Sequence, residues 1–178
     1  MTAAPAFPLA GVVAVVGSRH GSPYGVAQLA AAVVAAGGSV VTGCARGVDH
    51  AAATAAAAAA GVAPLRLLPP AYLALSTMPR VLVCRAAGRT PQAFATRTRY
   101  VVAFASAVAI FPPAGELGPG SVLALSLALR RAWAGVPVFY AGPAAPPTVA
   151  YQPPGSWRPA AVAGVCGWCW SPPMPMLF

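Results

Sequence analysis

Residues 39–61, SVVTGCARGVDHAAATAAAAAAG, decide the fold of this chain. The opening letters, SVVTG, form a short apolar run that ends in glycine, which predicts a strand buried in a sheet. Residues 48–60 have the length and alanine content of a helix, and Gly61 is placed to end it. A strand, a glycine-containing loop and a helix in this order predict one unit of an α/β fold.

The same alternation continues on both sides of this stretch. Upstream, GVVAVVG (11–17) predicts another buried strand, and residues 25–38 predict a helix that ends on a glycine pair. Downstream, we expect strands at 63–68, 80–84, 107–111 and 136–142, with helices at 91–105 and at 121–135, where Ser121 would cap the start. The alternation predicts an α/β, doubly wound, mostly parallel sheet with helices on both faces.

The last part of the chain has a different composition. Residues 143–159 are rich in proline and predict a linker, whereas AAVAGVCGWCW (160–170) could form an added edge strand before a loose tail. We therefore expect one domain over residues 1–142 and a C-terminal extension over residues 143–178.

The charge balance is strongly basic. The sequence has 11 Lys+Arg, all of them arginine, against 2 Asp+Glu, for a net charge of +9. Such an excess favours polyanionic partners, because the guanidinium group binds phosphate through two donors. A GC-rich coding bias, which replaces lysine by arginine, is the alternative explanation of this composition. The positions of the charged residues distinguish a coding bias from a binding surface.

Several classes of protein are disfavoured by composition. No uncharged run keeps the ~18 apolar residues of a membrane span, and the N-terminus lacks the basic residues that precede a signal-peptide core. We expect a cytoplasmic protein with no membrane partner. Cys166 and Cys169 have the spacing of redox and metal motifs but no second pair, so we interpret them as part of a packed strand and expect no metal site.

Three loops of the predicted fold contain the candidate ligand-binding residues. They contain GSRHGSPYG (17–25), TGCARGVDH (42–50) and PPAGELGPGS (112–121), and in an open parallel sheet they meet beyond the carboxyl ends of the strands. Each loop contains glycine, which lets the backbone approach a ligand closely. Each also leads into the N-terminus of a helix, where an anion is favoured. None matches a Walker loop or GxGxxG, so we do not expect a nucleotide triphosphatase or a dinucleotide cofactor.

These motifs, in this order, resemble the core of DNA-processing protein A (DprA, or Smf). The resembling pieces are VVGSR, VVTGCARGVDHAAATAA and FATRTRYVVAFASAVAIF, followed by a Gly-Ser that opens a helix. The resemblance covers roughly residues 11–142 and implies a Rossmann-like fold within the broader group that includes the Lonely Guy proteins. It also implies binding of single-stranded DNA.

The resemblance implies a set of site residues on the same loops. A phosphate pocket would be lined by Gly17, Ser18, Arg19, Thr42, Gly43, Arg46, Gly47, Asp49, Arg97, Arg99, Gly120 and Ser121. Because Arg97 and Arg99 are two residues apart, a fully helical segment would bring at most one of them to the pocket. Asp49 has two candidate roles: a first-turn carboxylate on the helix dipole, or a functional carboxylate that accepts from a sugar hydroxyl or orients Arg46.

The sequence departs from the family pattern at several positions. Thr98 stands where the family's Arg-Asn-Arg signature has asparagine, and Pro119 replaces the first serine of its Ser-Gly-Ser opening. The helical N-terminal domain and the winged helix of many members are not found in these residues, so the resemblance does not extend to the question of a recombinase partner. The short form could come from a cell's own genome or from a mobile element such as phage, and the resemblance to single-domain forms of this family favours the second.

Three functions remain open at this stage. The first is a non-catalytic module that binds the phosphates of single-stranded DNA, with no cofactor. The second is a nucleotide sensor or a structural, self-associating subunit with the same fold. The third is a nucleotide phosphoribohydrolase, for which PPAGELGPGS does not match the Pro-Gly-Gly-x-Gly-Thr motif of the Lonely Guy enzymes.

Overall fold

The computed structural model describes residues 6–20, 24–114 and 116–173. Over these residues the chain forms one sheet, whose strands lie in the order β3-β4-β2-β1-β5-β6-β8-β7. The strands are β1 (Val12–Gly17), β2 (Ser39–Thr42), β3 (Leu65–Leu67), β4 (Val81–Cys84), β5 (Ala107–Phe111), β6 (Val138–Tyr140), β7 (Ser156–Val162) and β8 (Val165–Ser171). The helices are α1 (Val26–Ala35), α2 (Val48–Ala60), α3 (Pro91–Phe104), α4 (Pro119–Ala132) and the short 3-10 helix η1 (Ala71–Ala74).

The first six strands are parallel, and β1 lies in the middle of them. Val13 of β1 pairs with Val40 of β2 on one side and with Ala107 of β5 on the other. On one side of β1 the sheet continues through β2, β4 and β3, and on the other side through β5 and β6. The chain completes the first side before it forms β5, so the direction of winding reverses between β1 and β5. This arrangement confirms the predicted doubly wound α/β fold.

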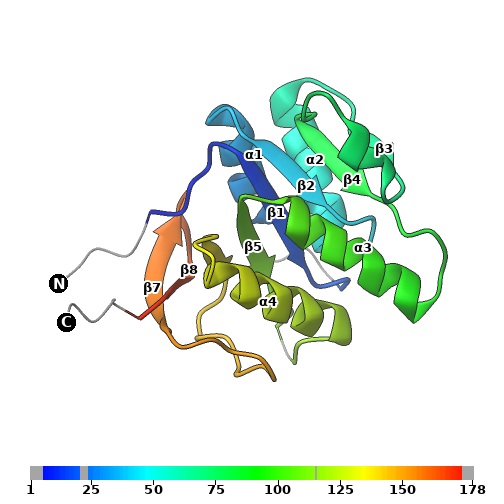
Figure 1. Cartoon of the computed structure of the whole chain (residues 1–178). Helices are drawn as coiled ribbons and strands as arrows, with labels where there is room; N and C mark the ends of the chain where they lie inside the picture. The colour runs from blue at the N-terminus through cyan, green and yellow to red at the C-terminus, as the bar shows by residue number, and fades with distance from the viewer. Residues whose placement is uncertain (1–5, 21–23, 115, 174–178) are drawn as a thin grey trace.

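Helices cover both faces of the sheet (Figure 1). Helices α1 and α2 pack on one face against the side chains of Val13, Val15 and Val40. Helices α3 and α4 pack on the other face against Ala14 and Ile110. Strands buried on both faces need continuous apolar runs, which explains why β1 and β5 consist almost entirely of valine, alanine, isoleucine and phenylalanine.

The last two strands form an antiparallel hairpin that extends the same sheet (Figure 1). Strand β8 pairs antiparallel with β6, through Phe139 and Cys169. Strand β7 then forms the outer edge and begins at Ser156, within the range that the proline content predicted as a linker. Pro159 lies in this outermost strand, and an edge is where a sheet tolerates proline.

The cysteines of the CGWC motif lie on this hairpin. Residues three apart in a strand point to opposite faces, and accordingly Cys166 of β8 is exposed whereas Cys169 is buried. Among the described residues no group of three or more His, Cys, Asp or Glu side chains is placed to hold a metal ion. In the same part of the chain, no helix has both the length and the apolar character needed to cross a bilayer.

The start of α4 differs from the prediction. The helix begins at Pro119, with Gly118 at the N-cap and no side-chain cap hydrogen bond, so Ser121 is the third helical residue and does not cap the helix. Proline is favoured at the first helical position because its φ angle is already helical and the position needs no N–H partner. The correction moves Gly120 and Ser121 into the first turn.

Candidate functional site

A cavity of about 770 Å³ opens at the carboxyl ends of β1 and β2, between α3 and the start of α4. Its position is that expected for a ligand site in an open α/β sheet, beside the point where the winding reverses. The lining residues come from the end of β1, the loops after β1, β2, β4 and β5, the first turn of α2, and helices α3 and α4. They are Val16, Gly17, Ser18, Arg19, His20, Gly43, Ala45, Asp49, Arg89, Pro91, Phe94, Ala95, Arg97, Thr98, Val101, Pro113, Glu116, Gly118, Pro119, Gly120, Ser121, Leu123 and Ala124.

The loop after β1 is shaped by close backbone contacts. A Cβ on Gly17 would lie 2.0 Å from the carbonyl oxygen of Phe111, so this position requires glycine. The N–H of Ser18 donates to the same carbonyl oxygen at 3.1 Å, and the carbonyl of Ser18 accepts from the N–H of Val48 at 3.0 Å. The hydroxyl of Ser18 bonds to the backbone of His20. The side chain of Ser18 therefore holds the loop in shape.

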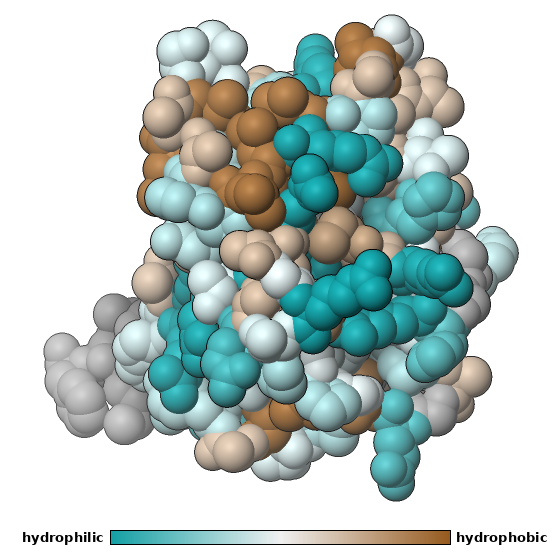
Figure 2. All heavy atoms as spheres, turned by 90° about the vertical axis from the view of Figure 1, so that its right-hand side faces the viewer, coloured by the Kyte–Doolittle hydropathy of each residue, from teal (hydrophilic) through white to brown (hydrophobic). Residues whose placement is uncertain are grey.

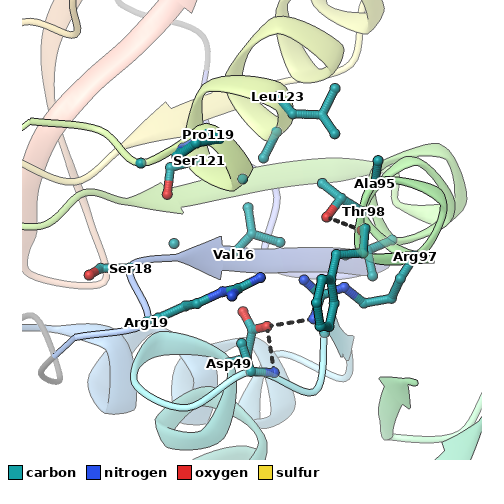
Figure 3. A pocket seen from close by; sticks show the side chains of 18 of the residues that line it. Val16, Ser18, Arg19, Asp49, Ala95, Arg97, Thr98, Pro119, Ser121 and Leu123 are labelled. Atoms are coloured by element: carbon teal, nitrogen blue, oxygen red, sulfur yellow. Dashed lines mark hydrogen bonds and ion pairs between the residues drawn. The ribbon is translucent and has the colours of Figure 1, made fainter. Parts of the chain in front are cut away.

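Arg19 and Arg97 enter the cavity from opposite sides (Figure 3). Arg19 follows β1 and is exposed, and its guanidinium carbon lies 4.8 Å from the ring centroid of Phe94. Arg97 extends from α3 and is only 7% exposed. The cavity therefore has one arginine that is accessible to solvent and one that is fixed by its surroundings.

Arg97 is paired with Asp49, which lies in the first turn of α2. Arg97 Nη1 lies 3.4 Å from Asp49 Oδ2, and the same carboxylate oxygen accepts from the N–H of Ala45 at 3.1 Å. A Cβ on Gly43 would lie 2.3 Å from Arg97 Nη1 and 2.4 Å from Asp49 Oδ2. The pair can form only because residue 43 has no side chain.

The protonation of Asp49 is set by competing effects. Burial raises the pKa of Asp49 above its ordinary value, because the site withholds water from the charged carboxylate. The charge of Arg97, the N–H of Ala45, the hydroxyl of Thr42 and the charge of Arg19 oppose that rise in pKa. The carboxylate is thus both a helix-dipole partner in the first turn and the counter-ion of a buried arginine.

The first turn of α4 faces this pair across the cavity (Figure 3). No side chain caps the start of the helix, and Gly118, Gly120 and Ser121 all line the cavity. Pro119 has no N–H, and the N–H of Ser121 donates to the carbonyl of Gly118 at 3.0 Å, so the positive charge of this turn comes mainly from the helix dipole. This end of the cavity is therefore suited to an anion.

The structure brings most of the predicted site residues to the cavity. Those that line it are Gly17, Ser18, Arg19, Gly43, Asp49, Arg97, Gly120 and Ser121. The other four do not line it: Thr42, Arg46, Gly47 and Arg99.

Each of these four exceptions has a physical reason. Thr42 is fully buried and its hydroxyl donates to the carbonyl of Val15 at 2.6 Å. Gly47 is the N-cap of α2. Arg46 is exposed outside the cavity, and the carboxylate of Asp49 pairs with Arg97 instead of orienting it. Arg99 is exposed because α3 is helical throughout and Arg97 occupies the inward face.

Phe94 and Arg89 also line the cavity, although the sequence motifs did not single them out. Phe94, Arg97, Thr98 and Val101 follow the i, i+3, i+4, i+7 spacing of one helical face. That spacing could have placed Phe94 beside Arg97 once the segment was taken as a helix. Arg89 lies just before α3 and has no comparable periodic signal.

Residues 6–65 match the family described as DNA recombination-mediator protein A. Among solved structures, DNA processing protein A from Helicobacter pylori is similar at 21% identity and a TM-score of 0.49, covering 81% of this chain and 68% of that chain; it was described for its single-stranded DNA binding mode. No curated protein matches the sequence. The family match includes β1, α1, β2 and α2 with the loops that carry Arg19 and Asp49, and it confirms the predicted resemblance to DprA over these residues.

Proposed function

We propose that this protein binds single-stranded DNA non-catalytically, and that the cavity takes one nucleotide of the strand by its phosphate. The observation that carries the proposal is the state of Arg97. Its side chain is 9% exposed, and among the described residues its Nε is a buried donor without a hydrogen-bond partner. A buried guanidinium donor without a partner is costly, and a phosphate oxygen supplied by a ligand would satisfy it.

The surroundings of Arg97 support an anionic ligand. Arg19 and Arg89 line the same cavity, and the uncapped start of α4 lies opposite. The charge of Asp49 balances that of Arg97. The lining then has two further positive charges, those of Arg19 and Arg89, and one further negative charge, that of Glu116. The cavity therefore keeps a positive balance that suits a phosphodiester.

The surface beside the cavity offers a path for the rest of a strand. Arg85 and Arg89 lie between β4 and α3, and Arg99 lies on α3; all three are exposed. These elements lie at the side of the molecule that Figure 2 shows, where strongly hydrophilic side chains gather across the middle of the face. Phosphate contacts of this kind hold a strand without reading its sequence.

The first experiment is fluorescence-polarisation binding of a labelled oligo-dT strand at several salt concentrations. If about four phosphates are neutralised, the log-log slope of affinity against salt should be about −2 to −3. Arg19→Ala should weaken binding, whereas Arg130→Ala should leave it nearly unchanged, because Arg130 is exposed at the opposite end of α4. Failure of the wild type to bind any single strand at low salt would overturn the proposal.

A free nucleotide is the second candidate ligand. The cavity volume of about 770 Å³ lies within the range of pockets that enclose one small molecule. Calorimetric titration with nucleoside monophosphates, combined with an assay for release of the free base, separates a sensor or a phosphoribohydrolase from a strand-binding protein. Tight binding of a mononucleotide with no binding of oligo-dT would favour this second function.

A further inference from the structure

We propose that Cys44 and Cys84 form a reversible disulfide when a peroxide oxidises Cys44, which makes this thiol pair a modification site beside the cavity. The inference goes beyond the proposed function, because the chemistry needs no bound strand. Cys44 is exposed in the loop after β2, and Cys84 is the buried last residue of β4. The pair therefore has one thiol that a dissolved oxidant reaches and one that is protected from it.

The sheet brings the two cysteines together. Strands β2 and β4 are paired neighbours, and Thr42, two residues before Cys44, is the partner of Val83, the residue before Cys84. Neighbouring strands lie about 4.8 Å apart, and the Cα atoms of a disulfide lie about 4.4 to 6.8 Å apart. Cys84 belongs to the core under α3, and Arg97 of α3 lies against Cys44, so both thiols are on the same face of the sheet.

The two thiols share one charged neighbour. Arg97 Nη1 lies 3.9 Å from Cys44 Sγ. Burial raises the pKa of Cys84 to about 12, the charge of Arg97 opposes that rise, and the thiol of Cys44 adds to it. Charges act on a pKa mainly over about 4 to 6 Å, so Cys84 lies close to both Arg97 and Cys44.

This environment sets the order of the two chemical steps. The thiolate of Cys44 attacks one oxygen of the peroxide and the O–O bond breaks, which leaves a sulfenic acid on Cys44 and a hydroxide that takes the proton released by Cys44. The sulfur of Cys84 then attacks Cys44 Sγ, the S–O bond breaks, and the departing hydroxide takes the proton of Cys84. Each sulfur gives up one electron, and the peroxide is reduced to two molecules of water.

The second cysteine pair of the chain cannot close in this way. Cys166 and Cys169 lie three residues apart on β8 and point to opposite faces of the sheet. Three residues of a strand span about 10 Å, which is beyond the reach of a disulfide. The CGWC spacing therefore carries no disulfide, although its letters suggest one.

The disulfide would act on the ion pair at the cavity. The loop after β2 contains Gly43 and Ala45, which both line the cavity, and the N–H of Ala45 donates to Asp49 at 3.1 Å. A bond from Cys44 to β4 fixes the loop that anchors Asp49. Oxidation would therefore reach the site without a chemical change in any residue that lines it.

The test treats Cys166→Ser with hydrogen peroxide, because Cys44 is then the one exposed thiol of the described residues. The intact mass should fall by two hydrogen atoms, and a non-reducing peptide map should contain the peptides of Cys44 and Cys84 joined. Dithiothreitol should reverse both changes. Cys84→Ala in the same background should instead gain one oxygen at Cys44, trapped by dimedone, and form no joined peptide.

Each other result overturns the proposal. Addition of oxygen at Cys44 of Cys166→Ser without a joined peptide would show that Cys84 does not reach it. A dimer joined through Cys44 would show that a second copy is closer than Cys84. An unchanged mass at peroxide concentrations that oxidise free glutathione would show that Cys44 is unreactive. These results come from Cys166→Ser alone, so they decide the proposal even if Cys84→Ala does not fold, and strand binding by the reduced protein is measured separately.

Discussion

Arg97 Nη1 and Asp49 Oδ2 lie 3.4 Å apart, although the two residues are 48 positions apart in the sequence. The contact joins α3 on one face of the sheet to the start of α2 on the other, beyond the carboxyl ends of β1 and β2. Both side chains are buried, at 9% and 6% exposure. The pair therefore links the two helical layers at the wall of the cavity, and in the proposed function the remaining donors of Arg97 contact the phosphate.

Removing one partner of this pair should be more harmful than removing both. Arg97→Met leaves Asp49 buried without its counter-charge, and we expect a loss of about 3 to 5 kcal/mol in the free energy of unfolding. The double variant Arg97→Met with Asp49→Asn should recover a large part of that loss, because neither charge remains. Urea unfolding of the single and double variants measures the coupling, and additive effects would show that the pair is not energetically linked.

Gly43 should tolerate no side chain. Gly43→Ala would place a Cβ 2.3 Å from Arg97 Nη1, which separates Arg97 from Asp49. We expect weaker strand binding together with a clear drop in stability, measured by polarisation and by thermal unfolding. Gly88→Ala is the matched control, since its Cβ would meet only Ala93 Cβ at 3.9 Å, an ordinary contact. Equal effects of the two variants would contradict the steric argument.

The two loop arginines should differ in their effect on binding. Arg19 lines the cavity, whereas Arg46 is exposed outside it. Arg19→Ala should weaken oligo-dT binding and reduce the salt slope by about 1, because one phosphate contact is lost. Arg46→Ala should change the affinity by less than about two-fold, as expected of a distant surface charge. A larger loss in Arg46→Ala than in Arg19→Ala would place the strand on another surface.

Strand binding should become tighter as the pH falls. Burial raises the pKa of Asp49 above 3.8, so Asp49 takes up a proton in the folded protein before it would in the unfolded chain. Protonation removes a negative charge beside Arg97 and favours the phosphate. By the same linkage, the contribution of Asp49 to stability is fully present below its pKa in the unfolded chain and is lost as the pH rises through its pKa in the folded protein.

Asp49→Asn isolates this effect from other titrating groups. His20 also lines the cavity and is present in both proteins, so the difference between wild type and variant reports Asp49 alone. We expect the variant to bind oligo-dT more tightly at neutral pH and to have a flatter pH profile. Parallel profiles of the two proteins would contradict the assignment.

The four cysteines should divide into two reactive and two protected thiols. Cys44 and Cys166 are exposed, whereas Cys84 and Cys169 are buried. Burial raises the pKa of Cys84 to about 12 and that of Cys169 to about 11, so little thiolate forms at neutral pH. Iodoacetamide should therefore label the first two in the native protein and all four after unfolding, as read by mass spectrometry.

The sequence by itself determined the six parallel strands, the four α-helices and the edge of the sheet at which the cavity opens. Continuous apolar runs such as 11–17 and 107–111 identify strands buried on both faces, and the intervening helices follow from length, alanine content and glycine stops. Parallel strands place their carboxyl ends at one edge, so the loops of Arg19, Asp49 and Ser121 had to meet there. These conclusions depend on local patterns and on the handedness of crossovers.

Only the tertiary structure decided which side chains meet. Thr42 and Arg46 belong to the same motif as Asp49, yet one is buried between strands and the other faces solvent. The pairing of Asp49 with Arg97, and the hairpin of β7 and β8 added beside β6, join segments far apart in the chain. Such contacts depend on how helices pack across the sheet, which no short stretch of sequence specifies.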